Sequence, residues 1–189
     1  LDRRGFLRLS VGTGAGLVIG AYIPVQSATA AQAAETADAV FNPFVTITPA
    51  NKVIVLSKHL DKGQGTATGL ATLVADELDA DWSQMVAEFA PANAALYKNT
   101  FFGVQGTGGS TAMANSFEQY RQAGAAARAM LVSAAAKEWK VPADSIQVKN
   151  GVVFHANGKK ATFGQLASAA AKEPVPEKVR LNDPKDFVY

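Results

Sequence analysis

The chain has 189 residues, with 18 lysines and arginines against 16 aspartates and glutamates, two histidines and no cysteine. The first thirty residues contain three of the cations and one of the acids, so the remainder carries 15 charges of each sign. This balance gives no indication of a nucleic-acid partner or an anionic surface. Without cysteine the chain lacks disulfides, iron–sulfur ligands and a thiolate nucleophile, and two distant histidines predict no zinc cluster.

The first residues have the composition of an export signal. Arg3 and Arg4 open the pattern Arg-Arg-x-Phe-Leu, and an uncharged, glycine-containing run follows over 11–23. A small-residue stretch over 27–34 then offers Ala-x-Ala cleavage sites. Together these parts predict a signal segment with a signal helix over 1–33, and the paired arginines resemble the twin-arginine subtype. The run is too short for a permanent membrane span, and it lacks the polar face of an amphipathic helix.

Beyond the leader, strand and helix patterns alternate. β-Branched and apolar residues over 44–48 and 52–57 predict two strands joined by a Pro-Ala-Asn turn. Apolar residues at helical spacing over 66–78 predict a helix with one buried face. A third strand is expected over 85–89. The stretch over 91–109, rich in glycine, asparagine and aromatic residues, is expected to be irregular.

The longest predicted helix begins at Ser110 or Thr111 and runs to about Trp139. Apolar and small residues recur there at steps of four and three, which makes one continuous stripe. The small residues around Gly124 indicate close packing against another element. Pro142 ends the helix.

The remaining elements are shorter. An Asn-Gly turn joins two strands over 145–149 and 152–155, which predicts a hairpin. A Thr-x-x-Gln capping box opens a last helix over 163–172. The proline-punctuated tail over 174–189 is expected to be extended, without a packed ending.

The element order is therefore β-β-α-β-α-β-β-α. It predicts an α/β (α+β) fold, a two-layer sandwich of a mixed sheet with helices on one face. We assign the domain to 41–173, since about 155 residues after the leader are enough for one compact core. Loop ends at one edge of the sheet would then be available for a ligand.

The first segment that could carry chemistry is Gly63-Gln64-Gly65, between a strand and a helix. Two glycines let the backbone come close to a ligand, and free N–H groups at a helix start suit an anion. The Gln64 amide donates and accepts in one plane, which suits an oxo group or the edge of a heterocycle. The alternative is an ordinary connecting turn with Thr66 as the helix cap.

The second segment is Thr107-Gly108-Gly109-Ser110-Thr111, again at the entrance to a helix. Its hydroxyls and backbone N–H groups could cradle a phosphate, although neither the Walker pattern nor a Gly-x-Ser-x-Gly elbow is present. The alternative is a flexible loop capped by Ser110 or Thr111. Two such helix starts in one small domain indicate a long ligand with several phosphate or oxo groups, gripped at two points.

Other candidate residues favour structural roles. We interpret His59 as a strand-end packing residue rather than a catalyst. The acidic run over 76–81 is typical of a solvated face. Trp82 and Trp139 are expected to be core or interface anchors.

Across nearly its whole length the chain resembles the molybdopterin-binding large subunits of the xanthine dehydrogenase/aldehyde oxidase superfamily. It is most similar to the branch of isoquinoline 1-oxidoreductase beta subunits and cytochrome-c-linked aldehyde dehydrogenases. The resemblance rests on the twin-arginine leader and on the segments 58–65 (Lys-His-Leu-Asp-Lys-Gly-Gln-Gly), 69–82, 106–110, 121–128, 174–176 and 183–187.

The resemblance implies a cofactor site. In that family the two segments contact a molybdenum pterin cofactor, commonly as its cytosine dinucleotide. The family usually has Glu-Met before Gly-Gln-Gly, whereas this chain has Asp61 and Lys62, and a lysine there would pair with a phosphate or point to solvent. Carried over to this sequence, the expected cofactor contacts are Gly63, Gln64, Gly65, Thr107, Gly108, Gly109, Ser110 and Thr111.

The resemblance also implies a larger assembly. Members of this branch are several times longer, and their general-base glutamate lies in a C-terminal region without a match here. We therefore expect the N-terminal, cofactor-binding portion of a periplasmic molybdenum hydroxylase of aldehydes or N-heteroaromatics, inactive alone. The expected partners are the C-terminal remainder of the large subunit, a small iron–sulfur subunit and a cytochrome c subunit, with no nucleic acid. The alternative is an exported, truncated, non-catalytic binding or scaffold module of the same fold.

Overall fold

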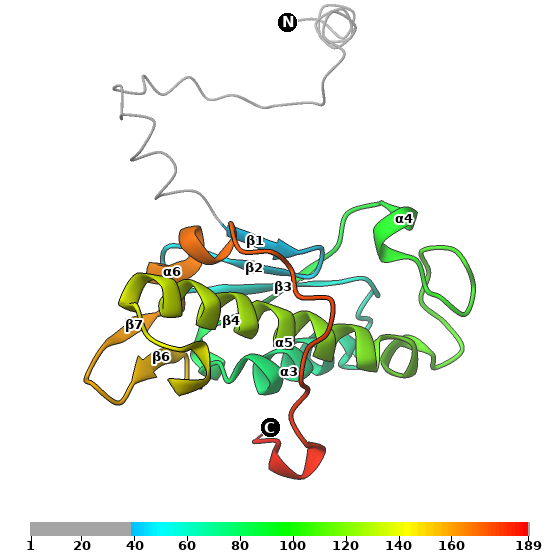
Figure 1. The fold of residues 1–189 in the computed structure, drawn as a ribbon. Helices are drawn as coiled ribbons and strands as arrows, with labels where there is room; N and C mark the ends of the chain where they lie inside the picture. Colours follow the sequence, from blue (N-terminus) through cyan, green and yellow to red (C-terminus); the bar gives the residue numbers. More distant parts are fainter. Residues whose placement is uncertain (1–38, 189) are drawn as a thin grey trace, which may run out of the picture.

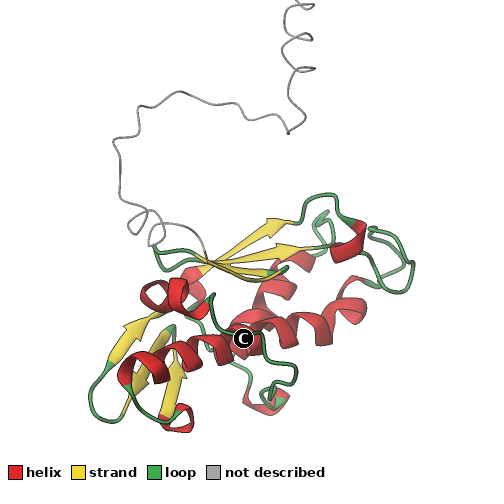
Figure 2. Cartoon of the chain, turned by 45° about the horizontal axis from the view of Figure 1, so that its top comes forward, coloured by secondary structure: helices red, strands yellow, loops and turns green. Residues whose placement is uncertain are grey.

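The computed structural model describes residues 39–188, which form two sheets and four α-helices (Figures 1 and 2). The predicted signal segment over 1–33, with its helix, lies outside the described residues. The first sheet has the strand order β1-β2-β3-β4, and the second has the order β5-β6-β7. The strands are β1 (Ala39–Asn42), β2 (Val45–Ile47), β3 (Val53–Ser57), β4 (Met85–Phe89), β5 (Ile146–Lys149), β6 (Val152–His155) and β7 (Lys160–Thr162).

The first sheet is mixed, as predicted. β1, β2 and β3 pair antiparallel, whereas β3 and β4 are parallel. Parallel neighbours need a crossover connection, and α3 (Thr66–Leu78) provides it, with the predicted bounds. Alternate side chains of β2 and β3 lie on the face of the sheet that packs against the helices. The fully buried ones are Val45, Ile47, Val53 and Val55.

The hairpin strands form a second sheet, which differs from the single mixed sheet of the prediction. β5 and β6 pair antiparallel around a turn in which Asn150 and Gly151 both have positive φ. β7, which was not predicted, pairs with the other edge of β6. Because this unit satisfies its backbone locally, it packs at the end of α5 instead of joining β4 (Figure 1). The predicted α/β class is nevertheless confirmed.

The helices cover one face of the first sheet (Figure 2). α5 (Ala112–Trp139) is the longest, and its stripe is buried from Tyr120 to Ala134. α6 (Phe163–Ala170) begins with the predicted capping box and packs against β1 and β2. α4 (Ala94–Tyr97) is a short helix within the stretch expected to be irregular. None of the helices in residues 39–188 combines the length and apolarity needed to cross a membrane.

The two tryptophans have different environments. Trp139 ends α5 and is buried, which confirms it as a core residue. Trp82, in the turn before β4, is 42% exposed and so does not anchor the core.

α3 and α5 approach most closely at Gly124. A Cβ added there would lie 2.9 Å from the Val74 carbonyl oxygen and 3.0 Å from Cβ of Glu77. Contacts this short leave no room for a side chain, because interiors are already close-packed. The close packing predicted around Gly124 is therefore confirmed.

The acidic run over 76–81 is not the solvated face that was predicted. Glu77 is fully buried, and its carboxylate pairs with the guanidinium of Arg121 at 2.7 Å. Phe117 and Phe187 lie near the same guanidinium, with ring centroids 5.3 and 5.1 Å away. The prediction failed because the cation that compensates Glu77 is 44 residues away in the sequence.

The tail is extended, but it is packed, contrary to the prediction. We call residues 174–188 the strap, since they cross α5 and reach α3 (Figure 1). The Asn182 N–H donates to Glu77 Oε2 at 2.9 Å, and its side-chain amide donates to the Asp76 carbonyl at 2.8 Å. Arg121 donates to the Asn182 carbonyl. The strap is thus fixed to the buried ion pair.

Replacing Glu77 with alanine should lower the free energy of unfolding by about 3 kcal/mol, because Arg121 would remain buried without its carboxylate. Urea denaturation measures this loss. Glu118→Ala, at an exposed position of α5, is the control and should change stability by less than about 0.5 kcal/mol. Equal, small losses for both variants would contradict the structural role of the pair.

Candidate functional site

The two segments singled out in the sequence lie against one hollow. Its volume is about 260 Å³. One wall comes from the loop before α3, and the other from the loop before α5. The lining residues are Lys62, Gln64, Thr107, Gly108, Ser110, Thr111 and Ala112.

The first segment differs from the expectation of free N–H groups. One oxygen of the Asp61 carboxylate accepts from the N–H groups of Gly63 at 2.8 Å and Gly65 at 3.2 Å, and the other accepts from Ala67 at 2.9 Å. These bonds lower the pKa of Asp61, with the bond from Ala67 contributing most. A side chain of the protein therefore already occupies the helix start that was expected to bind an anion.

The Gln64 amide is also used within the loop. Its oxygen accepts from the Lys62 N–H at 2.6 Å, and its nitrogen donates to the Leu60 carbonyl at 2.7 Å and to Thr66 Oγ1 at 3.1 Å. Thr66 does not cap α3, because the N-cap residue is Gly65, which has φ +81°. The Gln64 amide thus bonds within its own loop, and Lys62 is the cation of this loop that lines the hollow.

The second segment keeps more of its donors free. Gly109 and Ser110 are consecutive residues with φ +57° and +54°, and their N–H groups have no acceptor among the described residues. Ser110 is exposed, and its hydroxyl is likewise without a protein partner in the described chain. Thr111 is the N-cap of α5 but makes no side-chain cap bond; its hydroxyl donates to the Gly108 carbonyl at 2.8 Å and accepts from Asn99 at 2.9 Å.

His59 connects the two segments. It is 1% exposed, its Nε2 lies 3.1 Å from Ser116 Oγ, and its Nδ1 lies 3.4 Å from Thr107 Oγ1. Thr107 Oγ1 also accepts from the Leu60 N–H at 2.9 Å. His59 is thus a packed residue at the end of β3, as interpreted from the sequence, but it also positions a residue of the hollow, which the sequence did not indicate.

A buried cation lies next to His59. Lys58 is 3% exposed, and its Nζ donates to Gln119 Oε1 at 2.6 Å. Burial lowers the pKa of Lys58. Burial first, and then the charge of Lys58, lower the pKa of His59. Both effects favour a neutral His59 at pH 7.

Several large apolar side chains are exposed. Some lie in the loop between α4 and α5, and Phe89 and Leu60 end or follow strands of the first sheet. Three of the six follow one another closely in that loop, and a contiguous apolar patch is typical of a surface that another chain or domain covers. They are Leu60, Phe89, Leu96, Phe101, Phe102 and Val104.

The donors around the hollow fit the anionic part of a nucleotide-like cofactor. Ser110, with an unpaired N–H group and a free hydroxyl, lines one wall, next to the unpaired N–H group of Gly109, and Lys62 lines the other wall. These are the groups that bind phosphate. A Cβ added at Gly106 or Gly108 would meet no atom within 4 Å, so a ligand can approach the backbone there. No group of three or more histidine or acidic side chains in residues 39–188 could hold a metal ion directly.

A mixed α/β fold that brings two glycine-rich helix entrances to one anion-ready hollow defines a cofactor-binding domain. Residues 4–187 match the family model described as a molybdopterin cofactor-binding domain. The chain belongs to this family, and with it to the molybdopterin-binding region of the xanthine dehydrogenase/aldehyde oxidase superfamily.

Characterised relatives agree with the family. The isoquinoline 1-oxidoreductase subunit beta of Brevundimonas diminuta is 35% identical over 187 residues, which are 97% of this chain and 24% of that protein. The membrane-bound aldehyde dehydrogenase [pyrroloquinoline-quinone] of Gluconacetobacter polyoxogenes is 30% identical over 172 residues, 89% of this chain and 21% of that protein. The chain therefore spans about a quarter of the length of these relatives.

A solved structure supports the fold. Quinoline 2-oxidoreductase from Pseudomonas putida 86 superposes with a TM-score of 0.52 at 24% identity, over 69% of this chain and 16% of that one. This likeness concerns the fold alone.

His59 should make the stability depend on pH. A histidine whose pKa is lower in the folded chain is protonated first in the unfolded chain, so stability falls as the pH drops below about 6.5. His59→Gln should reduce this loss, measured as the shift in urea midpoint between about pH 7.5 and pH 5.5. An unchanged shift in His59→Gln would refute the assignment.

Proposed function

We propose that this chain is the cofactor-gripping portion of a molybdenum-dependent oxidoreductase that oxidises aldehydes or N-heteroaromatic compounds. The observation that carries the proposal is the single hollow shared by the two glycine-rich segments. We further propose that the pterin is bound as its cytosine dinucleotide, because two separated segments suit a ligand with several phosphate groups. The names of the relatives, an isoquinoline oxidoreductase and an aldehyde dehydrogenase, support the substrate classes.

Different residues at the hollow would contact different parts of the cofactor. The N–H groups of Gly109 and Ser110, with the Ser110 hydroxyl, would donate to phosphate oxygens. Lys62 would neutralise part of the phosphate charge across the hollow. Gly108 would let the ligand lie against the backbone, and Thr107 would be held in place by His59.

When bound, such a cofactor supplies the redox centre at which a water-derived oxygen is transferred to the substrate. The chain's own contribution is to bind and orient the cofactor. We assign the general-base glutamate and most of the substrate pocket to the remainder of the large subunit. Electrons would leave through a small iron–sulfur subunit and a cytochrome c subunit, in keeping with the absence of cysteine here.

The exposed apolar residues of the loop before α5 support the association with further polypeptide. Contiguous apolar surface is uncommon on proteins that function as isolated domains, because its exposure to water is unfavourable. We therefore favour the enzyme portion over a free-standing scaffold module.

Molybdenum and pterin content test the proposal. The chain, produced together with the polypeptide that completes the large subunit, should contain both, measured by elemental analysis and by fluorescence of the oxidised pterin. Gly108→Leu should lower both contents at least about tenfold, because its side chain would fill the hollow. Its φ is not positive and its Cβ would meet no atom within 4 Å, so the fold should persist.

Lys172→Gln provides the control, since Lys172 is exposed just beyond α6 and far from the hollow in the sequence. It should keep the wild-type content. A folded, metal-free and pterin-free wild-type complex would overturn the proposal. Recovery of pyrroloquinoline quinone instead, the cofactor in the name of one relative, would also overturn it.

We also propose periplasmic localisation through twin-arginine export. That route carries folded proteins, which a cofactor inserted in the cytoplasm requires. Replacing Arg3 and Arg4 together with lysine should leave a folded protein in the cytoplasm, as measured by fractionation. Replacing Arg8 alone with lysine is the control, because it leaves the pair intact. Undiminished export of the double variant would contradict this route.

A further inference from the structure

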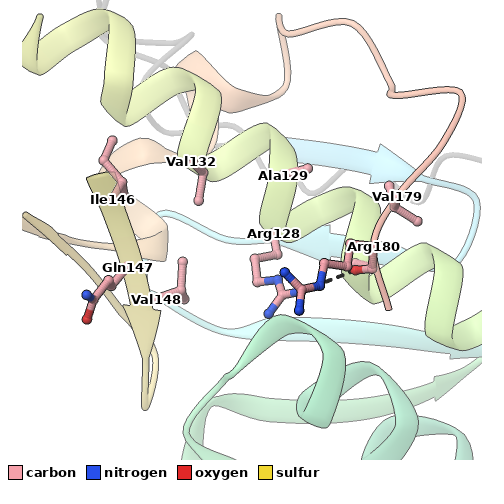
Figure 3. A pocket seen from close by; sticks show the side chains of 9 residues that line it. Arg128, Ala129, Val132, Ile146, Gln147, Val148, Val179 and Arg180 are labelled. Atoms are coloured by element: carbon pink, nitrogen blue, oxygen red, sulfur yellow. Dashed lines mark hydrogen bonds between the residues drawn. The ribbon is translucent and has the colours of Figure 1, made fainter. Parts of the chain in front are cut away.

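A second hollow, of about 430 Å³, lies between α5, β5 and the strap (Figure 3). Its volume is in the range of small-molecule sites. Arg128, which lines it, is 16 residues from Ala112 of the cofactor hollow on α5. That spacing places the two roughly 24 Å apart along the helix axis. The two hollows share no lining residue.

Six of the nine residues that line this second hollow are apolar. Val132 comes from α5, Ile146 and Val148 from β5, and Val179 from the strap. Ile146 is buried and the three valines are half-buried, so they present apolar surface without being sealed from solvent. A ligand body packed there would remove that surface from water, which is favourable.

The charged side chains of the lining are both arginines, and no acidic residue lines it. Arg128 donates from Nη1 to Asn182 Oδ1 at 2.9 Å and from Nη2 to the Arg180 carbonyl at 3.4 Å. Both acceptors are uncharged, so they orient the guanidinium without compensating its charge. The Arg180 side chain is exposed and has no hydrogen-bond or ion-pair partner within residues 39–188.

Arg121 gives a contrast on the same helix. It precedes Arg128 by seven residues and so lies on the same side of α5. Its charge is compensated by Glu77 at 2.7 Å. On this face of α5, Arg121 is paired with a carboxylate, whereas Arg128 is not. Arg180, which lines the hollow beside Arg128, has no carboxylate partner either.

We propose that the hollow of Arg128 and Arg180 binds an organic carboxylate with an apolar body. Guanidinium groups match the two oxygens of a carboxylate with paired donors, and an anion relieves the repulsion between two neighbouring cations. The body of the ligand lies against Val132, Val148 and Val179. Because the ligand touches α5, β5 and the strap together, it also stabilises the strap. This site is independent of the cofactor proposal.

Calorimetric titration of the chain with octanoate tests the proposal. Octanoate should bind with one site per chain, whereas octanol, which lacks the charge, and inorganic phosphate, which lacks the body, should bind at least about tenfold more weakly. In a sample labelled with 15N-arginine, the Nε–H signal of Arg128 should shift during the titration.

Two variants localise the site. Arg180→Gln should weaken octanoate binding about tenfold, since it removes a charge-assisted bond but keeps the backbone carbonyl that Arg128 contacts. Ala129→Leu should abolish binding by filling the hollow, and an unchanged unfolding midpoint shows that it is folded. Lys149→Gln, an exposed charge on β5 outside the lining, is the control and should bind as the wild type does.

If Arg180→Gln and Lys149→Gln weakened octanoate binding equally, the binding would be unspecific charge attraction and the proposed site would be wrong. Octanol binding as tightly as octanoate would show an apolar groove without carboxylate recognition. Phosphate binding as tightly as octanoate would show an adventitious ion only. None of these measurements depends on molybdenum or pterin, so the cofactor proposal can fail without affecting this one.

Discussion

The buried ion pair between Glu77 and Arg121 joins α3, α5 and the strap. It lies where α3 and α5 cross at Gly124, and the same two side chains bind the backbone of Asn182 in the strap. A charge in this position is tolerated only with its partner and with its remaining lone pairs filled, and both conditions are met. The helices that the pair joins, α3 and α5, are the ones that follow the two segments of the cofactor hollow.

The elements that could be predicted from the sequence are those whose signals lie within a few neighbouring residues. The bounds of α3 follow from apolar periodicity, and the hairpin follows from its Asn-Gly turn, because these signals act within a few residues. The burial of Glu77 and the packing of the strap depend on partners 44 and 105 residues apart. From the sequence alone the acidic run over 76–81 is expected to be exposed to solvent. The structure shows that Arg121 compensates the charge of Glu77. β7 was missed because two of its three residues, lysine and alanine, are depleted in strands.

The same division holds for the site. The glycines and hydroxyls of both segments were visible in the sequence, and the fold brings the segments to one hollow. The role of Asp61 could have been inferred, because an aspartate two residues before a glycine often bonds to the following N–H groups. The contact between His59 and Thr107, by contrast, spans 48 residues. No pattern in the sequence indicates it, because the loop that carries Thr107 has no regular structure.

Asp61 has a consequence for which groups remain available to a ligand. Its carboxylate accepts from the N–H groups at the start of α3, whereas the N–H groups of Gly109 and Ser110 before α5 have no acceptor among the described residues. Asp61 does not line the hollow, which the loop before α3 reaches through Lys62 and Gln64. On that wall an anion would therefore meet a side-chain cation, and on the wall before α5 it would meet backbone donors.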